Sequence, residues 1–202
     1  MSVTPTVRSS GGPMAIGGEI SAEVAARIRL VVFDVDGVLT DAGVYVGRSA
    51  SGDEVELKRF DIQDGLGIKM LLWAGLDVAL VSGRVSDATS MRARELGIDE
   101  CHQDPGAQKL PVLEDMLERK SLSWDQVAML ADDLPDVPVF SRVGLPAAVA
   151  NAQPEILELA VWRSRAEGGR GAVREFCRAL LVARGEWDRV VTAYVEKRGG
   201  LG

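Results

Sequence analysis

The feature that most limits the fold of this chain is a set of strand-length apolar runs, separated by segments with helical periodicity. An apolar run without alternation is typical of a strand buried on both faces, as in a parallel sheet with helices on each side. The predicted strands are Leu30–Phe33, Val78–Val81, Val127–Leu130 and Leu145–Val149. The predicted helices are Ala22–Arg29, Gly65–Ala74, Asp87–Leu96, Leu110–Lys120, Pro135–Val143 and Ala172–Ala183. We therefore expect an α/β fold with a Rossmann-like, doubly wound parallel sheet.

One segment departs from this pattern. Residues 44–60 alternate between apolar and polar residues around a central Ser-Gly-Asp, which predicts an antiparallel hairpin inserted into the fold. Residues 1–20, rich in Ser, Thr, Gly and Pro, are expected to form a disordered leader. Residues 21–184 then form the core, and residues 185–202 form a C-terminal helix or tail.

The composition excludes several classes of protein. The net charge is −7 and only 5% of residues are aromatic, unlike a nucleic-acid-binding protein with basic and aromatic residues on one stripe. No uncharged apolar stretch reaches the roughly 18 residues of a membrane span, and the cysteines, Cys101 and Cys177, suit a reducing cytoplasm. Residues 163–202 carry nine basic and five acidic residues, a net charge of +4. This basic end is either a solvated helix end or a tail that meets an anion held by the acidic body.

Polar residues that could take part in catalysis or bind a ligand follow three of the predicted strands. Asp34 and Asp36 follow the first strand, Ser82 follows the second, and Asp132 and Asp133 follow the third. The carboxyl ends of parallel strands form the ligand-binding edge of an open sheet, so these side chains are expected to meet. Gathered carboxylates repel one another unless a hard cation binds them, and oxygen-only ligands indicate Mg²⁺.

The same residue types can transfer a phosphoryl group. A carboxylate beside Mg²⁺ can attack phosphorus, and a second acid/base group then protonates the leaving oxygen and activates water. Hydrogen-bond donors on the phosphate oxygens complete the set. The residues of the right types for these roles are Asp34, Asp36, Ser82 and Lys109. A phosphoacceptor receiver domain uses similar groups in a different order along the chain, so the order here excludes it.

These residues stand in four motifs: Asp34-Val-Asp-Gly-Val-Leu-Thr-Asp41, Ser82-Gly-Arg84, Lys109 and Asp132-Asp-Leu-Pro-Asp136. Over residues 28–184 their order resembles the haloacid dehalogenase superfamily of phosphohydrolases. The resemblance implies that Asp34 is the nucleophile and Asp36 the general acid/base. Ser82 and Lys109 are implied to hold the phosphoryl group. The implied Mg²⁺ ligands are Asp34, the backbone carbonyl of Asp36 and Asp132, with Asp133 in support.

The gaps between these motifs leave no room for the cap domain that many members of the superfamily carry. Further segments, Lys58–Ile68, Arg84–Ile98 and Gly168–Glu175, resemble the capless family of 3-deoxy-D-manno-octulosonate 8-phosphate (KDO 8-phosphate) phosphatases. These are tetrameric enzymes of lipopolysaccharide synthesis. The resemblance implies that the Gly168–Gly171 segment reaches the site of a neighbouring subunit. The residues implied to bind the sugar-acid phosphate are Asp61, Ile62, Gln63, Asp64, Gly65, Lys69, Gly83, Arg84, Arg92 and Arg170.

The chain departs from the family pattern at three residues, and its stretch 103–108 before Lys109 is about one residue longer than expected. Ala131 stands where glycine is usual, Asp61 where asparagine is usual, and Lys69 where arginine is usual. These changes bear on the substrate more than on the chemistry. A phosphatase of nine-carbon sialic-type 9-phosphates, or of another sugar phosphate, is one alternative, although Arg84 favours the eight-carbon acid. A non-catalytic assembly module is another, although every catalytic position is present.

Overall fold

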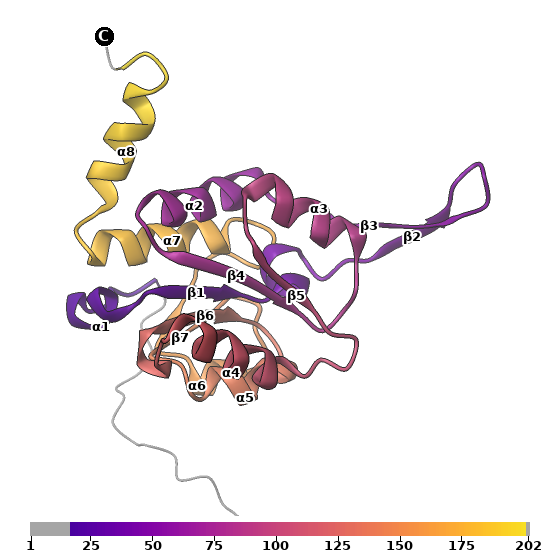
Figure 1. The fold of residues 1–202 in the computed structure, drawn as a ribbon, viewed down its shortest axis with the longest axis horizontal. Helices are drawn as coiled ribbons and strands as arrows, with labels where there is room; N and C mark the ends of the chain where they lie inside the picture. The colour runs from indigo at the N-terminus through magenta and orange to yellow at the C-terminus, as the bar shows by residue number, and fades with distance from the viewer. Residues whose placement is uncertain (1–16, 201–202) are drawn as a thin grey trace, which may run out of the picture.

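The computed structural model describes residues 17–200, which form an α/β fold around one six-stranded sheet (Figure 1). The strands are β1 (Leu30–Phe33), β4 (Asp77–Ser82), β5 (Glu100–Gln103), β6 (Val127–Ala131), β7 (Leu145–Ala148) and β8 (Trp162–Arg163). Their order is β5-β4-β1-β6-β7-β8, and all neighbouring pairs are parallel. The chain winds outward from β1 in both directions, as the sequence predicted.

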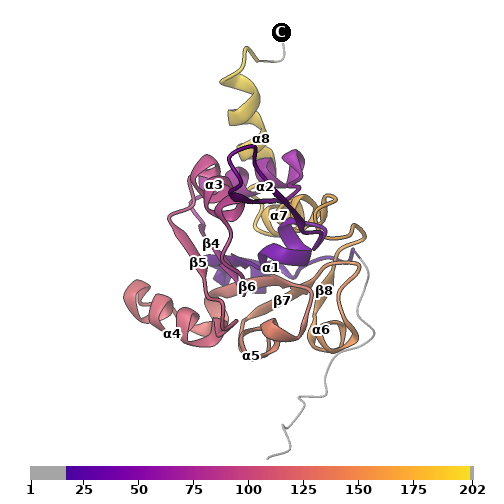
Figure 2. The same ribbon diagram turned by 90° about the vertical axis from the view of Figure 1, so that its right-hand side faces the viewer.

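Helices cover both faces of the sheet (Figures 1 and 2). One layer contains α2, α3 and α7, and the other contains α4, α5 and α6. The helices are α1 (Ala22–Arg27), α2 (Ile62–Trp73), α3 (Asp87–Leu96), α4 (Lys109–Lys120), α5 (Val137–Phe140), α6 (Pro154–Leu159), α7 (Ala172–Ala183) and α8 (Trp187–Glu196). The C-terminal α8 extends away from the sheet. None of the helices within residues 17–200 is long and apolar enough to cross a bilayer.

The core forms because apolar strand residues meet the apolar face of each helix. In α7, Val173, Phe176, Cys177 and Leu180 are buried at helical spacing and form its apolar face. The Phe176 ring lies edge-on to Phe33, with ring centroids 6.3 Å apart, and 5.3 Å from the Trp162 ring. This helix therefore belongs to the core and fixes the sheet from one side.

A two-stranded antiparallel hairpin, β2 (Tyr45–Arg48) and β3 (Glu54–Leu57), projects from one end of the sheet (Figure 1). It lies within the predicted range 44–60, and every residue of β2 is exposed. Between β1 and α4 the described chain holds only this hairpin, a short turn, α2, β4, α3 and β5. The capless architecture is therefore confirmed.

Two strands, β5 and β8, and one helix, α6, were not predicted from the sequence. Each lacks the apolar run or helical periodicity by which buried strands and helices are recognised. β5 and β8 are the edge strands of the sheet, so each is paired along one side only. β5 has the sequence Glu-Cys-His-Gln and β8 has only two residues, and a polar or short edge resists pairing with other chains. α6 is a single short helix of six residues with proline at its start.

Two helix boundaries also differ. α2 begins before the predicted Gly65, because the Asp61 carboxylate accepts the N–H groups of Gln63 and Asp64 and so caps the helix. The predicted helix Pro135–Val143 is divided into the 3₁₀ turn η3 (Leu134–Asp136) and α5. Proline at position 138 has no N–H to bond the carbonyl four residues before it, which prevents one continuous helix.

The expected disordered leader is wrong at its C-terminal end. Within residues 17–20, the Gly17 N–H donates to a carbonyl of β8 at 2.8 Å, and the Trp162 indole donates to the Gly18 carbonyl at 2.8 Å. These bonds attach the segment to the sheet edge. The rest of the expected leader, residues 1–16, lies outside the described residues.

The packing of α7 gives a stability prediction. Phe176→Ala removes a fully buried ring between Phe33 and Trp162, so the free energy of unfolding should fall by about 3–5 kcal/mol. Val182→Ala, on the exposed side of the same helix, should change it by less than about 0.5 kcal/mol. Urea unfolding of both variants measures the difference, and equal losses would contradict the assignment of α7 to the core.

Candidate active site

The site lies where β1 and β6 end side by side. β1 and β6 are neighbours in the sheet, and the chain winds outward from them in opposite directions. Such a switch point is where open α/β sheets bind ligands. Asp34 follows β1, and the turn η1 (Val35–Leu39) then bends the chain with Gly37 at φ +109°. A Cβ on Gly37 would lie 2.0 Å from an Asp132 oxygen, so only glycine fits between the two loops.

Three carboxylates and one ammonium meet at this switch point. Carboxylate oxygens of Asp34, Asp132 and Asp136 lie within 4.8 Å of one another. Lys109, the first residue of α4, donates to Asp34 and also to Asp136, the latter at 2.5 Å. Lys109, Asp34 and Asp136 are each less than 5% exposed. The fold thus buries two acidic groups against one cation and places a third, the partly buried Asp132, beside them.

Burial and mutual repulsion shift the pKa values of this cluster. Burial, followed by the charges of Asp34 and Asp136, raises the pKa of Asp132 from 3.8 to about 9. Burial and the charge of Asp34 also raise the pKa of Asp136. Burial by itself lowers the pKa of Lys109, but its two carboxylate partners outweigh that effect and raise the pKa well above its usual value. Lys109 is a fixed cation that balances only part of the negative charge.

The surplus charge and one unpaired atom fit a bound divalent cation. Asp132 Oδ1 is buried and has no hydrogen-bond partner among the described residues, which costs free energy unless a ligand binds it. Clustered carboxylate oxygens are the donors that Mg²⁺ prefers. Asp133 lies outside this cluster: it is exposed, and its carboxylate accepts the Leu134 N–H at 2.7 Å at the start of η3.

Asp36 lies beside the cluster, with Oδ1 bonded by Lys58 and Oδ2 beside the Ser82 hydroxyl, which also faces the Arg84 carbonyl. Lys58 Nζ donates to Oδ1 at 2.6 Å, and the Ser82 hydroxyl lies 3.1 Å from Oδ2. Ser82 is held in turn by the Arg84 N–H, which donates to its Oγ at 3.0 Å. The structure therefore brings the four predicted catalytic residues, Asp34, Asp36, Ser82 and Lys109, to one end of the sheet.

Known proteins combine this fold and these motifs. The haloacid dehalogenase-like hydrolase family matches residues 103–169. The 3-deoxy-D-manno-octulosonate 8-phosphate phosphatase KdsC of Escherichia coli K12 is 41% identical over 174 residues, which cover 85% of this chain and 90% of that enzyme. The chain belongs to the KDO 8-phosphate phosphatase family. The resemblance seen in the sequence is thereby confirmed.

Solved structures of KDO 8-phosphate phosphatases share the fold as well. The enzyme from Yersinia pestis has a TM-score of 0.76 and 40% identity, over 83% of this chain and 88% of that one. The enzyme from Moraxella catarrhalis, crystallised with magnesium ion, phosphate ion and KDO, has a TM-score of 0.79 and 32% identity. That similarity covers 86% of this chain and 97% of the other.

The segment Asp61 to Gly65, which the family resemblance implies to bind substrate, contains residues that hold the fold together and residues that are exposed. Asp61 caps α2, and the side chains of Ile62 and Gln63 are exposed. Asp64 is buried and accepts the N–H groups that begin α7, from Arg174 at 2.7 Å among them. Burial raises the pKa of Asp64 to about 6. Gly65 leaves room for Arg92, because a Cβ there would lie 2.2 Å from its guanidinium.

The cationic residues predicted to bind the substrate differ in how exposed they are and in whether the protein already bonds them. Arg84 is half exposed and donates to Glu56 at 2.9 Å. Arg92 is buried and donates to Glu95 at 2.8 Å and to the Asp61 carbonyl at 3.0 Å. Lys69 lies partly buried in α2. Gly83, next to Ser82, lies close to Ala107, where a Cβ would approach to 2.9 Å.

The Gly168–Gly171 segment packs on its own chain. The Gly169 N–H donates to a carbonyl of η1 at 2.9 Å, and Arg59 donates to the Gly169 carbonyl at 2.6 Å. A Cβ on Gly168 would lie 1.7 Å from the Gly37 carbonyl. Arg170 pairs with Asp41 at 3.5 Å. The backbone expected to reach a neighbouring subunit's site is thus used here to support the loop that follows Asp34.

Three residues of the site had no role in the sequence prediction. Asp136 stands four residues after Asp132, and this spacing across a turn was the available signal. Glu56 in β3 and Lys58 directly after it both face the site, but a period of two in a hairpin does not reveal which face is covered. Their roles become visible only once the hairpin is placed beside Asp36.

The raised pKa of Asp132 predicts how a cation affects stability. In the metal-free fold this carboxyl binds its proton more tightly than in the unfolded chain, so the free energy of unfolding falls as pH rises from about 4 to 9. Mg²⁺ competes with that proton and should therefore raise Tm more at about pH 8 than at about pH 5. Thermal unfolding with and without Mg²⁺ measures this. In Asp132→Asn the Mg²⁺ shift should shrink at both pH values, and an unchanged shift would contradict the assignment.

Proposed function

We propose that this protein is a Mg²⁺-dependent phosphatase that hydrolyses KDO 8-phosphate to KDO and phosphate through an aspartyl-phosphate. The observation that carries the proposal is the buried cluster of Asp34, Asp132, Asp136 and Lys109 with Asp36 beside it. A structural module has no need to bury three carboxylates around one lysine. Membership of the phosphatase family supplies the substrate class.

In this mechanism Asp34 attacks phosphorus while Asp36 protonates the oxygen of the leaving sugar. Asp36 then takes a proton from the water that hydrolyses the aspartyl-phosphate. Lys109 and the Ser82 hydroxyl hold the phosphoryl oxygens. Lys109 also orients the Asp34 carboxylate through their direct contact.

Mg²⁺ would be held by Asp34, Asp132 and the backbone carbonyl of Asp36, and it would supply positive charge to the phosphoryl oxygens. Asp133 would support the site by fixing η3 through its bond to Leu134. Asp136 would position Lys109, to which it is bonded at 2.5 Å.

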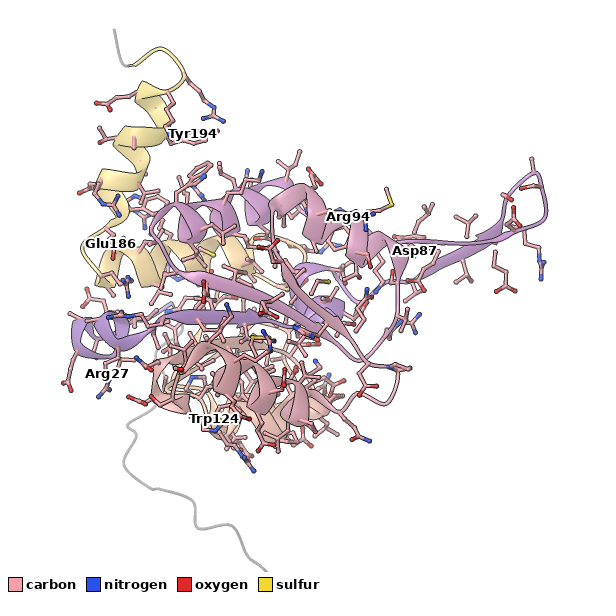
Figure 3. The ribbon with its side chains drawn as sticks, in the orientation of Figure 1. Arg27, Asp87, Arg94, Trp124, Glu186 and Tyr194 are labelled. Atoms are coloured by element: carbon pink, nitrogen blue, oxygen red, sulfur yellow. The ribbon has the colours of Figure 1, made fainter. Side chains whose placement is uncertain are left out.

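The sugar acid would bind beside the phosphoryl group, in the groove of about 1380 Å³ between the hairpin and α3. Figure 3 shows Asp87, which lines this groove, at the start of α3 beside the base of the hairpin. Arg84 would bind the substrate carboxylate, and Arg92 would order the segment around it. The remaining proposed contacts are Asp61, Ile62, Gln63, Asp64, Gly65, Lys69, Gly83 and Arg170. A nine-carbon sugar-acid 9-phosphate remains the alternative substrate.

We further propose that the enzyme is a cytoplasmic homotetramer of lipopolysaccharide precursor synthesis. The exposed apolar residues of the hairpin support an assembly, since Tyr45, Val46 and Leu57 are each at least 59% exposed. A second copy that covers the hairpin would also close the groove against water. The basic C-terminal tail that begins at Gly168 would act in the site of a neighbouring subunit.

The nucleophile can be tested by one substitution. Asp34→Asn keeps the size of the side chain but removes the charge that attacks phosphorus, so phosphate release from KDO 8-phosphate should fall at least about 10³-fold. The substitution relieves repulsion within the cluster, and Tm should not fall. Glu54→Gln, an exposed change in the hairpin, is the control. Retained turnover in Asp34→Asn would contradict the mechanism.

The substrate can be tested with a panel of sugar phosphates in the presence of Mg²⁺. We expect kcat/KM for KDO 8-phosphate to exceed that for a nine-carbon sugar-acid 9-phosphate and for hexose phosphates by at least about tenfold, roughly 1.4 kcal/mol of transition-state stabilisation. Phosphate release is measured in each case. A preference for the nine-carbon acid would leave the chemistry intact and correct the substrate.

A further inference from the structure

Lys58 holds the proposed acid/base in a closed arrangement. Its side chain is fully buried, and its Nζ lies 2.6 Å from Asp36 Oδ1. The Ser82 hydroxyl lies 3.1 Å from the other oxygen, Oδ2. A group that must protonate a leaving oxygen needs one oxygen free to face it. In this structure Lys58 holds Oδ1, and the Ser82 hydroxyl, which lies equally close to the Arg84 carbonyl, covers Oδ2.

Glu56 reaches toward the same lysine without bonding it. Glu56 in β3 and Lys58, the residue directly after β3, both point to the Asp36 side, while Leu57 between them is 61% exposed. Glu56 Oε1 is buried, has no hydrogen-bond partner among the described residues and lies 3.8 Å from Lys58 Nζ. Its other oxygen, Oε2, accepts from Arg84 at 2.9 Å. The Ser86 hydroxyl also faces the Glu56 carboxylate and, together with Arg84, lowers its pKa.

These contacts form a row of alternating charges, from Arg84 through Glu56 and Lys58 to Asp36. Arg84, at the outer end, is half exposed and can take an anion from solution. An anion bound there competes with Glu56 for the guanidinium. Lys58 Nζ would need to move by only roughly 1 Å to reach hydrogen-bond distance from Glu56 Oε1.

We propose that Glu56 and Lys58 are positioning residues that release Asp36 only when an anionic group of the substrate occupies Arg84. The anionic group draws Arg84 from Glu56, Glu56 takes the Lys58 ammonium, and Asp36 Oδ1 is left to face the leaving oxygen. No bond is made or broken in this exchange of ion pairs. The proposal rests on the phosphatase function proposed above, and it makes selectivity for a sugar acid appear in kcat as well as in KM.

Two variants test the exchange in the Mg²⁺-loaded, full-length enzyme, with kcat measured on KDO 8-phosphate and on glucose 6-phosphate, which has no carboxylate. Lys58→Met removes the closed arrangement, so kcat on glucose 6-phosphate should rise. Glu56→Gln removes the charge that draws Lys58 away, so kcat on KDO 8-phosphate should fall about tenfold and that on glucose 6-phosphate much less. The ratio of kcat on KDO 8-phosphate to kcat on glucose 6-phosphate should fall in both variants. In Lys58→Met it falls because the glucose 6-phosphate value rises, and in Glu56→Gln it falls because the KDO 8-phosphate value drops.

Glu54→Gln, on strand β3 but exposed and paired with Arg48, is the matched control and should leave the ratio unchanged. A loss of stability lowers both kcat values together, so the ratio separates positioning from folding, and Glu56→Gln decides the matter if Lys58→Met does not fold. An unchanged ratio in Glu56→Gln, or an equal fall on both substrates, overturns the exchange. A wild-type enzyme without preference for the sugar-acid phosphate would instead overturn the proposed function.

Discussion

The contact of one buried lysine with two buried carboxylates is the interaction on which the site depends. Lys109 lies between Asp34 and Asp136, with Asp132 close by. Three carboxylates in a space of this size repel one another strongly when water is excluded. Lys109 reduces that repulsion, and the charge that remains creates the demand for a cation. The position of Asp34 and the affinity of the cluster for a cation therefore both depend on the same charge balance.

This charge balance requires loops that cannot shift apart. Gly37 lets the turn after β1 approach Asp132, and Gly168 lets the segment before α7 approach that same turn. Neither position has space for a side chain. The start of α7 is held in addition by the buried Asp64 of α2. Segments far apart in the sequence are thus joined at the end of the sheet, and the carboxylates are in place before any ligand arrives.

The sequence was sufficient to predict the central strands, the helices on both faces and the residues at the strand ends. Continuous apolar runs such as Val127–Leu130 reveal burial directly, and the topology then brings Asp34 and Asp132 together. Edge strands such as β5 have no such signal, because one side is unpaired and polar residues are tolerated there. Lys58 and Asp136 were missed for a different reason. Their roles depend on which charged groups face them across the fold, and spacing along the chain does not contain that information.

The exposed hairpin and the loops at the end of the sheet differ in how well they tolerate amino-acid substitution. Phosphoryl-transfer groups lie in loops locked together by glycine contacts, where an added methyl group already clashes. The hairpin has few neighbours of its own, yet its inner face carries Glu56 and Lys58 to the edge of the reaction centre. Substitutions in the hairpin can therefore alter which molecules are accepted while the machinery for cleaving the phosphate ester stays intact. In a chain of this kind, new substrate ranges would arise by variation in a small two-stranded insertion, with the six-stranded sheet left untouched.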